Sequence, residues 1–203
     1  MVLKRMHTAL LTASLLLTGK VAVAETPQTQ EAMSAEWKKI EITDVKNPVT
    51  LFHKDWMALA AGNKDAMNAM TIGWGSIGEL WQKPVVTVYV APERHTNGFL
   101  EKSDYFTVTA FPESKREALT YIGSHSGRDG DKLKVAGLTP EFTTLGNPVF
   151  KEGSLAIECK IIYKDTFKPE FMKGAPVEFY KNRKLSPHVI YVGEVVNVWE
   201  KKK

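Results

Sequence analysis

Three short segments of the chain gather the residue types that hold an anion. They are Asn68–Gly75, Tyr89–Thr96 and Ser124–Lys132, and each sets glycine, hydroxyl or basic side chains beside an apolar run. Glycine lets the backbone approach a ligand closely. Hydroxyls, backbone N–H groups and Arg or Lys donate to phosphate oxygens. Three such segments in one small chain predict a nucleotide-type ligand.

The third segment is the strongest chemical signal. It offers two hydroxyls and two cations around Gly127, namely Ser124, Ser126, Arg128 and Lys132. Arg can fork onto phosphate oxygens, and Lys adds a mobile point charge. The alternative is a solvated loop in which Arg128 pairs with Asp129 or Asp131. Composition alone leaves both interpretations open.

The other two segments also have two interpretations. Arg94 with Thr96 is a second anion-binding candidate at a strand end, or else part of a surface turn after Pro92. In Asn68–Gly75 a flat ring could lie against the backbone, or the segment is a strand with a bulge at Gly73.

Several enzyme classes lack their sequence signatures here. The chain has no nucleophile elbow, no P-loop and no H-E-x-x-H, and its glycines do not form a strand–GxGxxG–helix pattern. The five histidines are scattered, which makes a poor metal site. The single cysteine, Cys159, cannot form an internal disulfide and is interpreted as a small strand residue rather than a redox-active thiol.

The N-terminus resembles a secretory signal. Residues 1–24 contain a basic start, a modest apolar stretch too short to span a bilayer, and Ala22-Val-Ala24 as a cleavage site before Glu25. A disordered or helical cytoplasmic tail is the alternative. The signal predicts a periplasmic or secreted protein whose mature chain begins at Glu25, with a linker over 25–45 and one domain over 46–203.

Charge gives no support for nucleic-acid binding. The chain has 203 residues and a formal net charge of +4, and residues 1–24 carry three cations and no acid, so the mature charge is +1. No interleaved basic and aromatic stripe occurs. We therefore expect no nucleic-acid partner and no membrane span in the mature chain.

Hydrophobic patterning predicts many short strands and few helices. Strands are expected over 56–61, 67–72, 85–90, 105–110, 149–150, 155–163, 178–180 and 188–199. Helices are expected over 96–102, over 112–122 with Gly123 ending it, and over 129–136 with Gly137 closing it. From residue type alone, packing is a more common role for Trp74 and Trp81 than stacking on a ligand ring. This mainly β pattern indicates an antiparallel barrel or sandwich with one or two packed helices.

The order of the motifs resembles the flavin reductase-like family. The matching stretches are Asn68–Ser76, Lys83-Pro84, Thr87–Val90, Arg94 with Thr96, Tyr105–Val108, Ser126–Asp129 with Lys132, and His188–Val195. They span about residues 50–198. The resemblance implies an antiparallel split β-barrel that binds FMN, usually as a homodimer with FMN near the subunit interface.

Residue by residue, the resemblance implies a cofactor site. It sets Asn68, Met70, Thr71, Ile72, Gly73 and Trp74 beside the isoalloxazine and ribityl chain. It sets Arg94, Thr96, Ser126, Arg128 and Lys132 where the phosphate is held, with Ser124 in the same loop as a further candidate. Two positions depart from the pattern: many relatives have Arg where this chain has Ala91, and many NADH-using members have Gly-Asp-His where it has Ser186-Pro187-His188.

The resemblance implies electron transfer through FMN, with the protein supplying binding and orientation. We expect an oxidoreductase that passes electrons from NAD(P)H or another small-molecule donor to free flavin or a small acceptor such as ferric chelates, quinones or nitro compounds. His188 is the catalytic candidate, or else a structural histidine at a strand end. The alternatives are a non-enzymatic exported carrier of flavin or a heme-like ligand, and a structural dimeric barrel without cofactor.

Overall fold

The computed structural model describes residues 34–202, and the signal sequence and mature start predicted from the sequence lie outside this range. The strands are β1 Trp37–Lys39, β2 Met57–Gly62, β3 Met67–Ile72, β4 Gly75–Leu80, β5 Lys83–Val90, β6 Tyr105–Ala110, β7 Pro140–Phe142, β8 Pro148–Phe150, β9 Leu155–Thr166 and β10 Val189–Lys201. The helices are η1 Ile42–Asp44, α1 Pro48–Thr50, η2 Leu51–Asp55, α2 His95–Leu100, η3 Glu113–Lys115, α3 Arg116–Ser124, α4 Lys132–Val135, η4 Pro169–Phe171 and α5 Ala175–Arg183.

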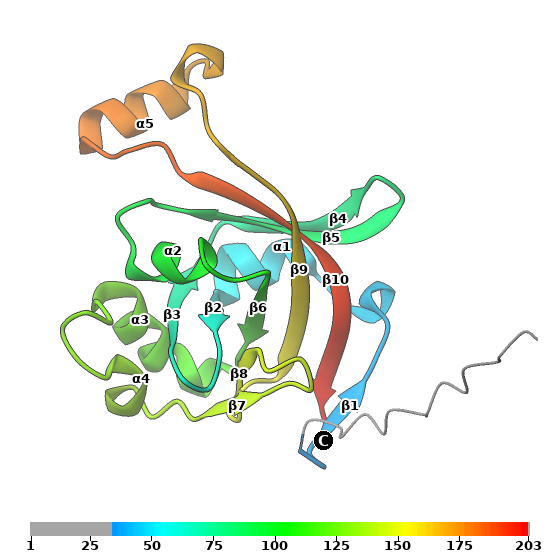
Figure 1. The fold of residues 1–203 in the computed structure, drawn as a ribbon. Helices are drawn as coiled ribbons and strands as arrows, with labels where there is room; N and C mark the ends of the chain where they lie inside the picture. Colours follow the sequence, from blue (N-terminus) through cyan, green and yellow to red (C-terminus); the bar gives the residue numbers. More distant parts are fainter. Residues whose placement is uncertain (1–33, 203) are drawn as a thin grey trace, which may run out of the picture.

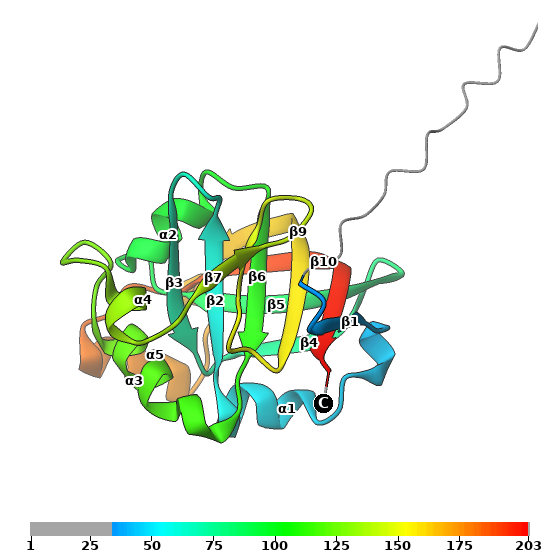
Figure 2. The ribbon, with the colours of Figure 1, turned by 90° about the horizontal axis from the view of Figure 1, so that it is seen from below.

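The strands form one strongly bent antiparallel sheet. Its order is β3-β2-β6-β9-β10-β5-β4, with β1 paired to β10, while β7 and β8 form a separate hairpin. Figures 1 and 2 show the sheet curling around itself, with α3 and α4 on one side. Gly193 permits the bend in β10, because a Cβ there would lie 2.6 Å from the Phe106 ring. The expected mainly β antiparallel fold is confirmed.

The core has two layers that meet at β2. Met57 and Leu59 face the barrel interior, whereas Ala58 and Ala60 face the helices and pack in the same cluster as Leu119. Side chains of a strand alternate between its two faces, so a strand buried on both faces is apolar throughout. The small alanines allow α3 to approach the sheet closely. This packing brings the end of α3 to the edge of β3.

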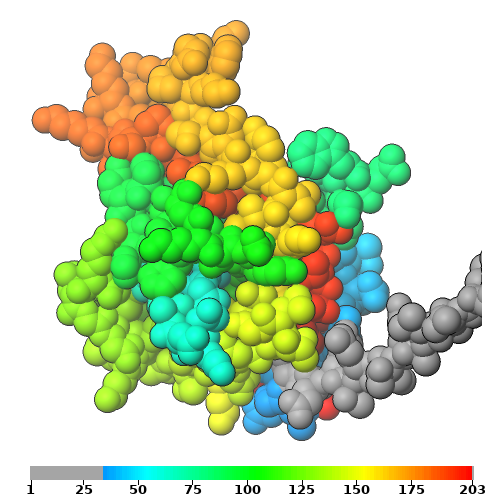
Figure 3. Space-filling model, viewed as in Figure 1, coloured from blue at the N-terminus to red at the C-terminus, as the bar shows by residue number. Residues whose placement is uncertain are grey.

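Between β9 and β10 the chain leaves the barrel. Residues 167–188, here called the arm, contain η4 and α5 and stand out from the barrel in Figures 1 and 3. Every described side chain of α5 is at least partly exposed. The arm therefore contributes little to the core, but it forms a wall beside the outer ends of β3 and β5.

Three details differ from the sequence-based expectations. The strand predicted over 178–180 is wrong, because Gly174 has a positive φ of 69° and Pro176 starts the helix α5. The strand β4 was missed, since its Gly75, Ser76 and Gly78 have low β propensity. Gly123 lies inside α3, which runs to Ser124.

The interpretation of Trp74 and Trp81 as packing residues is also wrong. Their side chains are 48% and 62% exposed. Trp81 and Gln82 occupy the two central positions of the β4–β5 turn with φ of 54° and 60°, a conformation usually given to Asn or Gly. The turn points the Trp81 ring away from the core. Cys159, by contrast, is fully buried in β9, as expected of a small strand residue.

Candidate functional site

Two adjoining cavities collect the residues that the sequence singled out. The first, here the polar cavity, has a volume of about 180 Å³ and is lined by Asn68, Met70, Glu93, Arg94, His95, Thr96, Ser124, His125, Ser126, Arg128 and Lys132. The second, here the aromatic groove, has about 310 Å³ and is lined by Met70, Thr71, Ile72, Gly73, Trp74, Tyr89, Ala91, Arg94, Phe179, Arg183, Leu185 and His188. Met70 and Arg94 border both, so one extended ligand can occupy the two together.

The fold clamps three separate segments around the polar cavity. Asn68 of β3 donates from Nδ2 to Oγ1 of Thr96 in α2, at 2.8 Å, and both side chains are buried. Gly127 packs against the same amide: a Cβ there would lie 2.2 Å from Asn68 Oδ1. Only glycine fits so close an approach without moving its neighbour. The strand, the helix and the loop after α3 are therefore held in one fixed arrangement.

Three cations converge on this cavity without carboxylate partners. Lys132 is buried and donates from Nζ to the carbonyls of Ile122 at 2.9 Å and His125 at 3.0 Å. Arg94 Nη1 donates to the carbonyl of Gly123 at 2.8 Å, and Arg128 Nη1 to that of Glu93 at 3.2 Å. Within residues 34–202, none of the three forms an ion pair.

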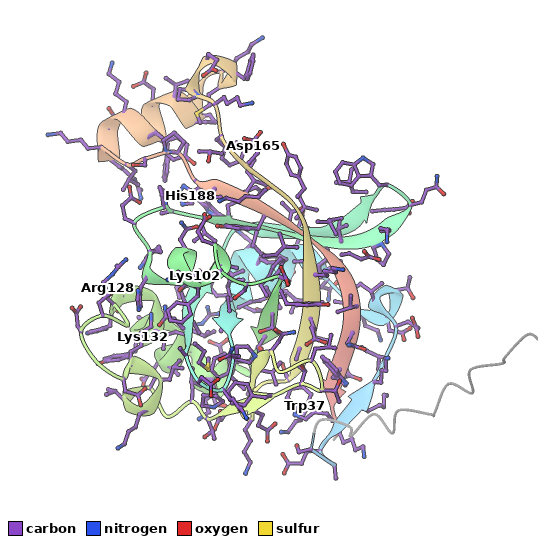
Figure 4. The ribbon with its side chains drawn as sticks, in the orientation of Figure 1. Trp37, Lys102, Arg128, Lys132, Asp165 and His188 are labelled. Atoms are coloured by element: carbon purple, nitrogen blue, oxygen red, sulfur yellow. The ribbon has the colours of Figure 1, made fainter. Side chains whose placement is uncertain are left out.

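The alternative interpretation, in which Arg128 pairs with Asp129 or Asp131, is therefore wrong. Asp131 instead accepts the backbone N–H of Lys134 at 3.1 Å and caps α4. Figure 4 shows Arg128, in the loop after α3, and Lys132, the first residue of α4, on the same side of the molecule. Their positive charge remains available to an anion.

The proximity of the cations changes the protonation of their neighbours. Burial, reinforced by the nearby charge of Arg94, lowers the pKa of Lys132 to about 8. Burial also lowers the pKa of His95, with further contributions from Arg128 and Lys132. Removing a cation from water and setting it beside like charges both disfavour the protonated form. An anion in the cavity would reverse this effect.

The aromatic groove runs from the polar cavity toward the arm. On one wall lie Thr71, Ile72, Gly73 and Trp74; Thr71 Oγ1 donates to the carbonyl of Leu119, and Gly73 packs near the Trp56 indole. On the other wall the rings of Phe179 and His188 lie 5.3 and 5.1 Å from the Trp74 ring. The groove thus has backbone along one side and aromatic rings at its outer end. Its size and its lining suit a flat ring.

His188 is oriented by the arm. Its Nδ1 lies 3.0 Å from the Tyr180 hydroxyl, and it sits at the start of β10, at the base of the arm in Figure 4. Burial lowers the pKa of His188; the Glu93 carboxylate acts in the opposite direction, and Arg94 lowers the pKa further. The lowered pKa favours the neutral imidazole, and Nδ1 is the ring nitrogen engaged with Tyr180.

All thirteen site residues predicted from the sequence border one or both cavities. Ser124 is the weakest of them, since its hydroxyl donates back to the carbonyl of Thr120 at 2.8 Å. Sequence reasoning missed two histidines of the polar cavity, His95 and His125, and the arm residues of the groove, Phe179, Arg183 and Leu185. Both histidines lie inside segments already singled out. The arm residues belong to a stretch whose sequence pattern predicts a strand and not the helix α5.

Among residues 34–202, no group of three His, Cys, Asp or Glu side chains could hold a metal ion. In the same range, no helix is long and apolar enough to cross a membrane.

The sequence matches the flavin reductase like domain over residues 51–203, and the chain belongs to that family. Solved structures with the same split-barrel fold include the FMN-binding protein of Thermus thermophilus with bound 1-cyclohex-2-enone, 24% identical, TM-score 0.58, covering 73% of each chain. The flavoredoxin of Methanosarcina acetivorans is 21% identical, TM-score 0.59, over 81% of this chain and 76% of that one. A Streptomyces globisporus NADH:FAD oxidoreductase is 17% identical, TM-score 0.55, over 79% and 87%. No curated protein matches the sequence.

Proposed function

We propose that this chain binds FMN and acts as an oxidoreductase that passes electrons from a reduced donor, through FMN, to free flavin or a small acceptor. Membership of the flavin reductase-like family supports the class of reaction. The FMN-binding protein and the flavoredoxin among the structural neighbours support the choice of FMN.

The observation that carries the proposal is a cluster of cations with spare donors. An ammonium has three N–H donors and a guanidinium has five. Lys132 uses two of its donors on backbone carbonyls, and Arg94 and Arg128 each use one nitrogen. The remaining donors line a cavity of about 180 Å³, which accommodates a phosphate group. A cation cluster with this surplus, in which Lys132 is buried, is stabilised by a dianion.

In this proposal the chain's residues bind and orient the cofactor. Arg94, Arg128 and Lys132 hold the phosphate, with the Thr96 and Ser126 hydroxyls beside them. The isoalloxazine ring lies in the aromatic groove along Thr71 to Trp74, and His188 holds a proton at Nδ1 or Nε2 next to it. Bound FMN supplies the electron-transfer chemistry, so no acid–base pair of the protein is required.

The phosphate assignment is tested by comparing FMN with riboflavin, which lacks the phosphate. Replacing Arg128 with Ala should weaken FMN binding by roughly tenfold or more, as expected for a lost charge-assisted hydrogen bond. Riboflavin affinity should stay unchanged. Lys134→Ala, an exposed lysine of the same α4, is the control and should alter neither affinity. Equal losses for both flavins would contradict the assignment.

The identity of the electron donor depends on Ser186-Pro187-His188, which stand where many NADH-using members of the family have Gly-Asp-His. We propose that NAD(P)H is not the physiological donor if the protein is exported, and a non-enzymatic exported flavin carrier remains the second candidate. Anaerobic NADH or NADPH should then leave the flavin bands intact while dithionite bleaches them. Bleaching by NADH would instead make the protein an NADH-dependent reductase. Sequencing the native N-terminus tests export: Glu25 is expected, and an intact Met1 would contradict it.

We also propose a homodimer, which is usual for proteins that the sequence resembles. Sedimentation velocity of the mature protein should give twice the mass of one chain. A monomer at micromolar concentration would contradict this part of the proposal.

A further inference from the structure

A third and larger cavity opens between the arm and β5. It has a volume of about 600 Å³ and is here called the arm pocket. Its lining residues are Trp74, Tyr89, Phe167, Phe171, Met172, Lys173, Ala175, Pro176, Phe179 and Tyr180. This size is that of a small-molecule site. Of the residues assigned to FMN, only Trp74 also lines this pocket.

The lining is almost entirely aromatic and aliphatic, with Lys173 as its one charged residue. Tyr89 and Phe167 form a stacked pair with ring centroids 5.4 Å apart and planes at 27°, and Trp74 and Phe179 form a tilted pair at 5.3 Å. Such faces bind flat rings by offset stacking or edge-to-face contact. The pocket therefore favours a planar apolar ligand.

Two of these rings are left unusually open to solvent. Phe171 is 75% exposed and Trp74 is 48% exposed. Large apolar rings gathered on a surface mark a binding site rather than a packing arrangement. Because the rings border a concave cavity, a small ligand can cover several of them at once.

The arm pocket is continuous with the aromatic groove. Trp74, Tyr89 and Phe179 line both. Only these shared aromatic side chains would thus stand between a ligand in the arm pocket and a flavin ring in the groove. That arrangement is the one required for electron transfer between the two ligands.

The charge of the lining favours an uncharged ring over a nicotinamide dinucleotide as the ligand of the arm pocket. A nicotinamide dinucleotide carries a diphosphate and two riboses, which need several cations or hydrogen-bonding groups. Lys173 is the single cation of the lining, the Tyr180 hydroxyl is already engaged with His188, and Tyr89 adds one further hydroxyl. An uncharged ring with carbonyl oxygens fits better, since Lys173 can donate to one carbonyl.

We propose that the arm pocket binds a flat, uncharged quinone, which is the electron acceptor of the FMN site. The inference rests on the proposed function and names its acceptor class. The quinone gains two electrons and two protons and becomes a hydroquinone, while reduced FMN gives up the same two electrons and two protons. The donor then restores reduced FMN.

Binding without turnover is the first test. The probe is 2,3-dimethyl-1,4-naphthoquinone, which has no free quinone-ring position to react with thiols or amines, dialysed against the oxidised FMN-loaded protein. Binding should saturate at one quinone per chain. Phe171→Ser should weaken it by about five- to tenfold, as expected for one lost aromatic contact. Trp81→Ser removes another largely exposed ring from the distant β4–β5 turn and should leave quinone binding unchanged.

Reoxidation gives an independent readout. After reduction by dithionite, the rate of flavin reoxidation should saturate with the quinone, and Phe171→Ser should raise the half-saturating concentration by a similar factor. Reoxidation by ferricyanide, a polar acceptor, should be the same in both proteins. Phe171→Tyr, which keeps the ring, should restore quinone binding.

Three results would overturn the proposal. The first is that the quinone does not bind saturably to the FMN-loaded protein, and the second is that Phe171→Ser and Trp81→Ser change quinone affinity equally. The third is that the Phe171→Ser protein separates into single chains while its quinone affinity is unchanged. The last result would assign the arm pocket to an interface between two copies. A chain that takes up no FMN at all would instead contradict the proposed function, and the two failures are therefore distinguishable.

Discussion

The polar cavity and the arm pocket are built by opposite means. In the polar cavity, β3, α2 and the loop after α3 are tied together by hydrogen bonds between buried groups, such as Asn68 with Thr96 and Lys132 with two carbonyls. In the arm pocket, exposed rings such as Phe171 lie on a segment that stands away from the barrel. One site is rigid and polar, and the other is open and apolar.

This difference suggests that the polar cavity holds a permanently bound cofactor and the arm pocket an exchanging acceptor. A cofactor that stays bound needs a preorganised site whose donors cost no rearrangement. An acceptor that arrives oxidised and leaves reduced needs an open site with contacts that are individually weak. Substitutions should therefore have large effects in the polar cavity and small ones on the arm, and the following predictions test that ordering.

The largest effect is expected at Gly127. In Gly127→Ala the new Cβ would meet Asn68 Oδ1 at 2.2 Å and displace an amide that is bound to Thr96. We expect the free energy of unfolding to fall by roughly 1–3 kcal/mol, as for overpacking or loss of a buried hydrogen bond. FMN affinity should fall by roughly tenfold or more if Asn68 has to move away, each tenfold being about 1.4 kcal/mol.

Gly98→Ala is the matched control in urea unfolding and FMN titration. Gly98 lies in α2, and a Cβ there meets no atom within 4 Å. Alanine should stabilise that helix by about 0.5–1 kcal/mol. If the two variants behaved alike, the close approach at Gly127 would not be what holds the cavity together.

The same contrast explains how far the sequence could be read. The polar cavity was predictable because its chemistry is local: Ser126-Gly-Arg128 and Arg94 with Thr96 are each visible within a few residues. The strands with strong β-branched or alternating patterns, such as 85–90 and 105–110, were predictable for the same reason, since period-two hydrophobicity is a local signal.

The arm was not predicted, because the short run 178–180, taken without the residues before it, has the composition of a strand. The helix there is decided by Gly174 and Pro176 together. Nor does the sequence reveal that Trp74 is exposed while Phe106 is fully buried, since both are large aromatic residues and residue type alone does not fix burial. Exposure depends on which segments pack above a residue, and that is a tertiary property.

The next effect is the pH dependence of FMN binding, which we expect to follow the protonation of Lys132. Burial and the nearby charge of Arg94 lower the pKa of Lys132 to about 8. Only the protonated ammonium attracts phosphate, so FMN affinity should be steady near pH 7 and decline as pH rises above about 8. Isothermal titration at several pH values measures this. Affinity that stayed constant up to pH 10 would remove Lys132 from the phosphate site.

In the protein without FMN, the free energy of unfolding should change with pH in the opposite direction to FMN affinity. The unfolded chain retains a lysine with the ordinary pKa of 10.5, so between about pH 8 and 10.5 it binds more protons than the folded chain. Stability therefore rises with pH in that window as far as Lys132 contributes. Lys132→Met has no titrating group at this position, and its unfolding free energy should lack that rise.

The smallest effect is expected on the arm, at Tyr180. Its hydroxyl lies 3.0 Å from His188 Nδ1 in a part-buried position, whereas the Asn68–Thr96 bond of 2.8 Å is buried. Tyr180→Phe should cost about 0.5–1 kcal/mol, because water can replace a partner near the surface. Thr96→Val, which is similar in shape, should cost about 1–3 kcal/mol, because the Asn68 amide is left unsatisfied. Urea unfolding gives both values, and FMN affinity should fall in Thr96→Val alone. Equal costs would mean that the arm is as firmly built as the polar cavity, and the division between a fixed cofactor site and an open acceptor site would not hold.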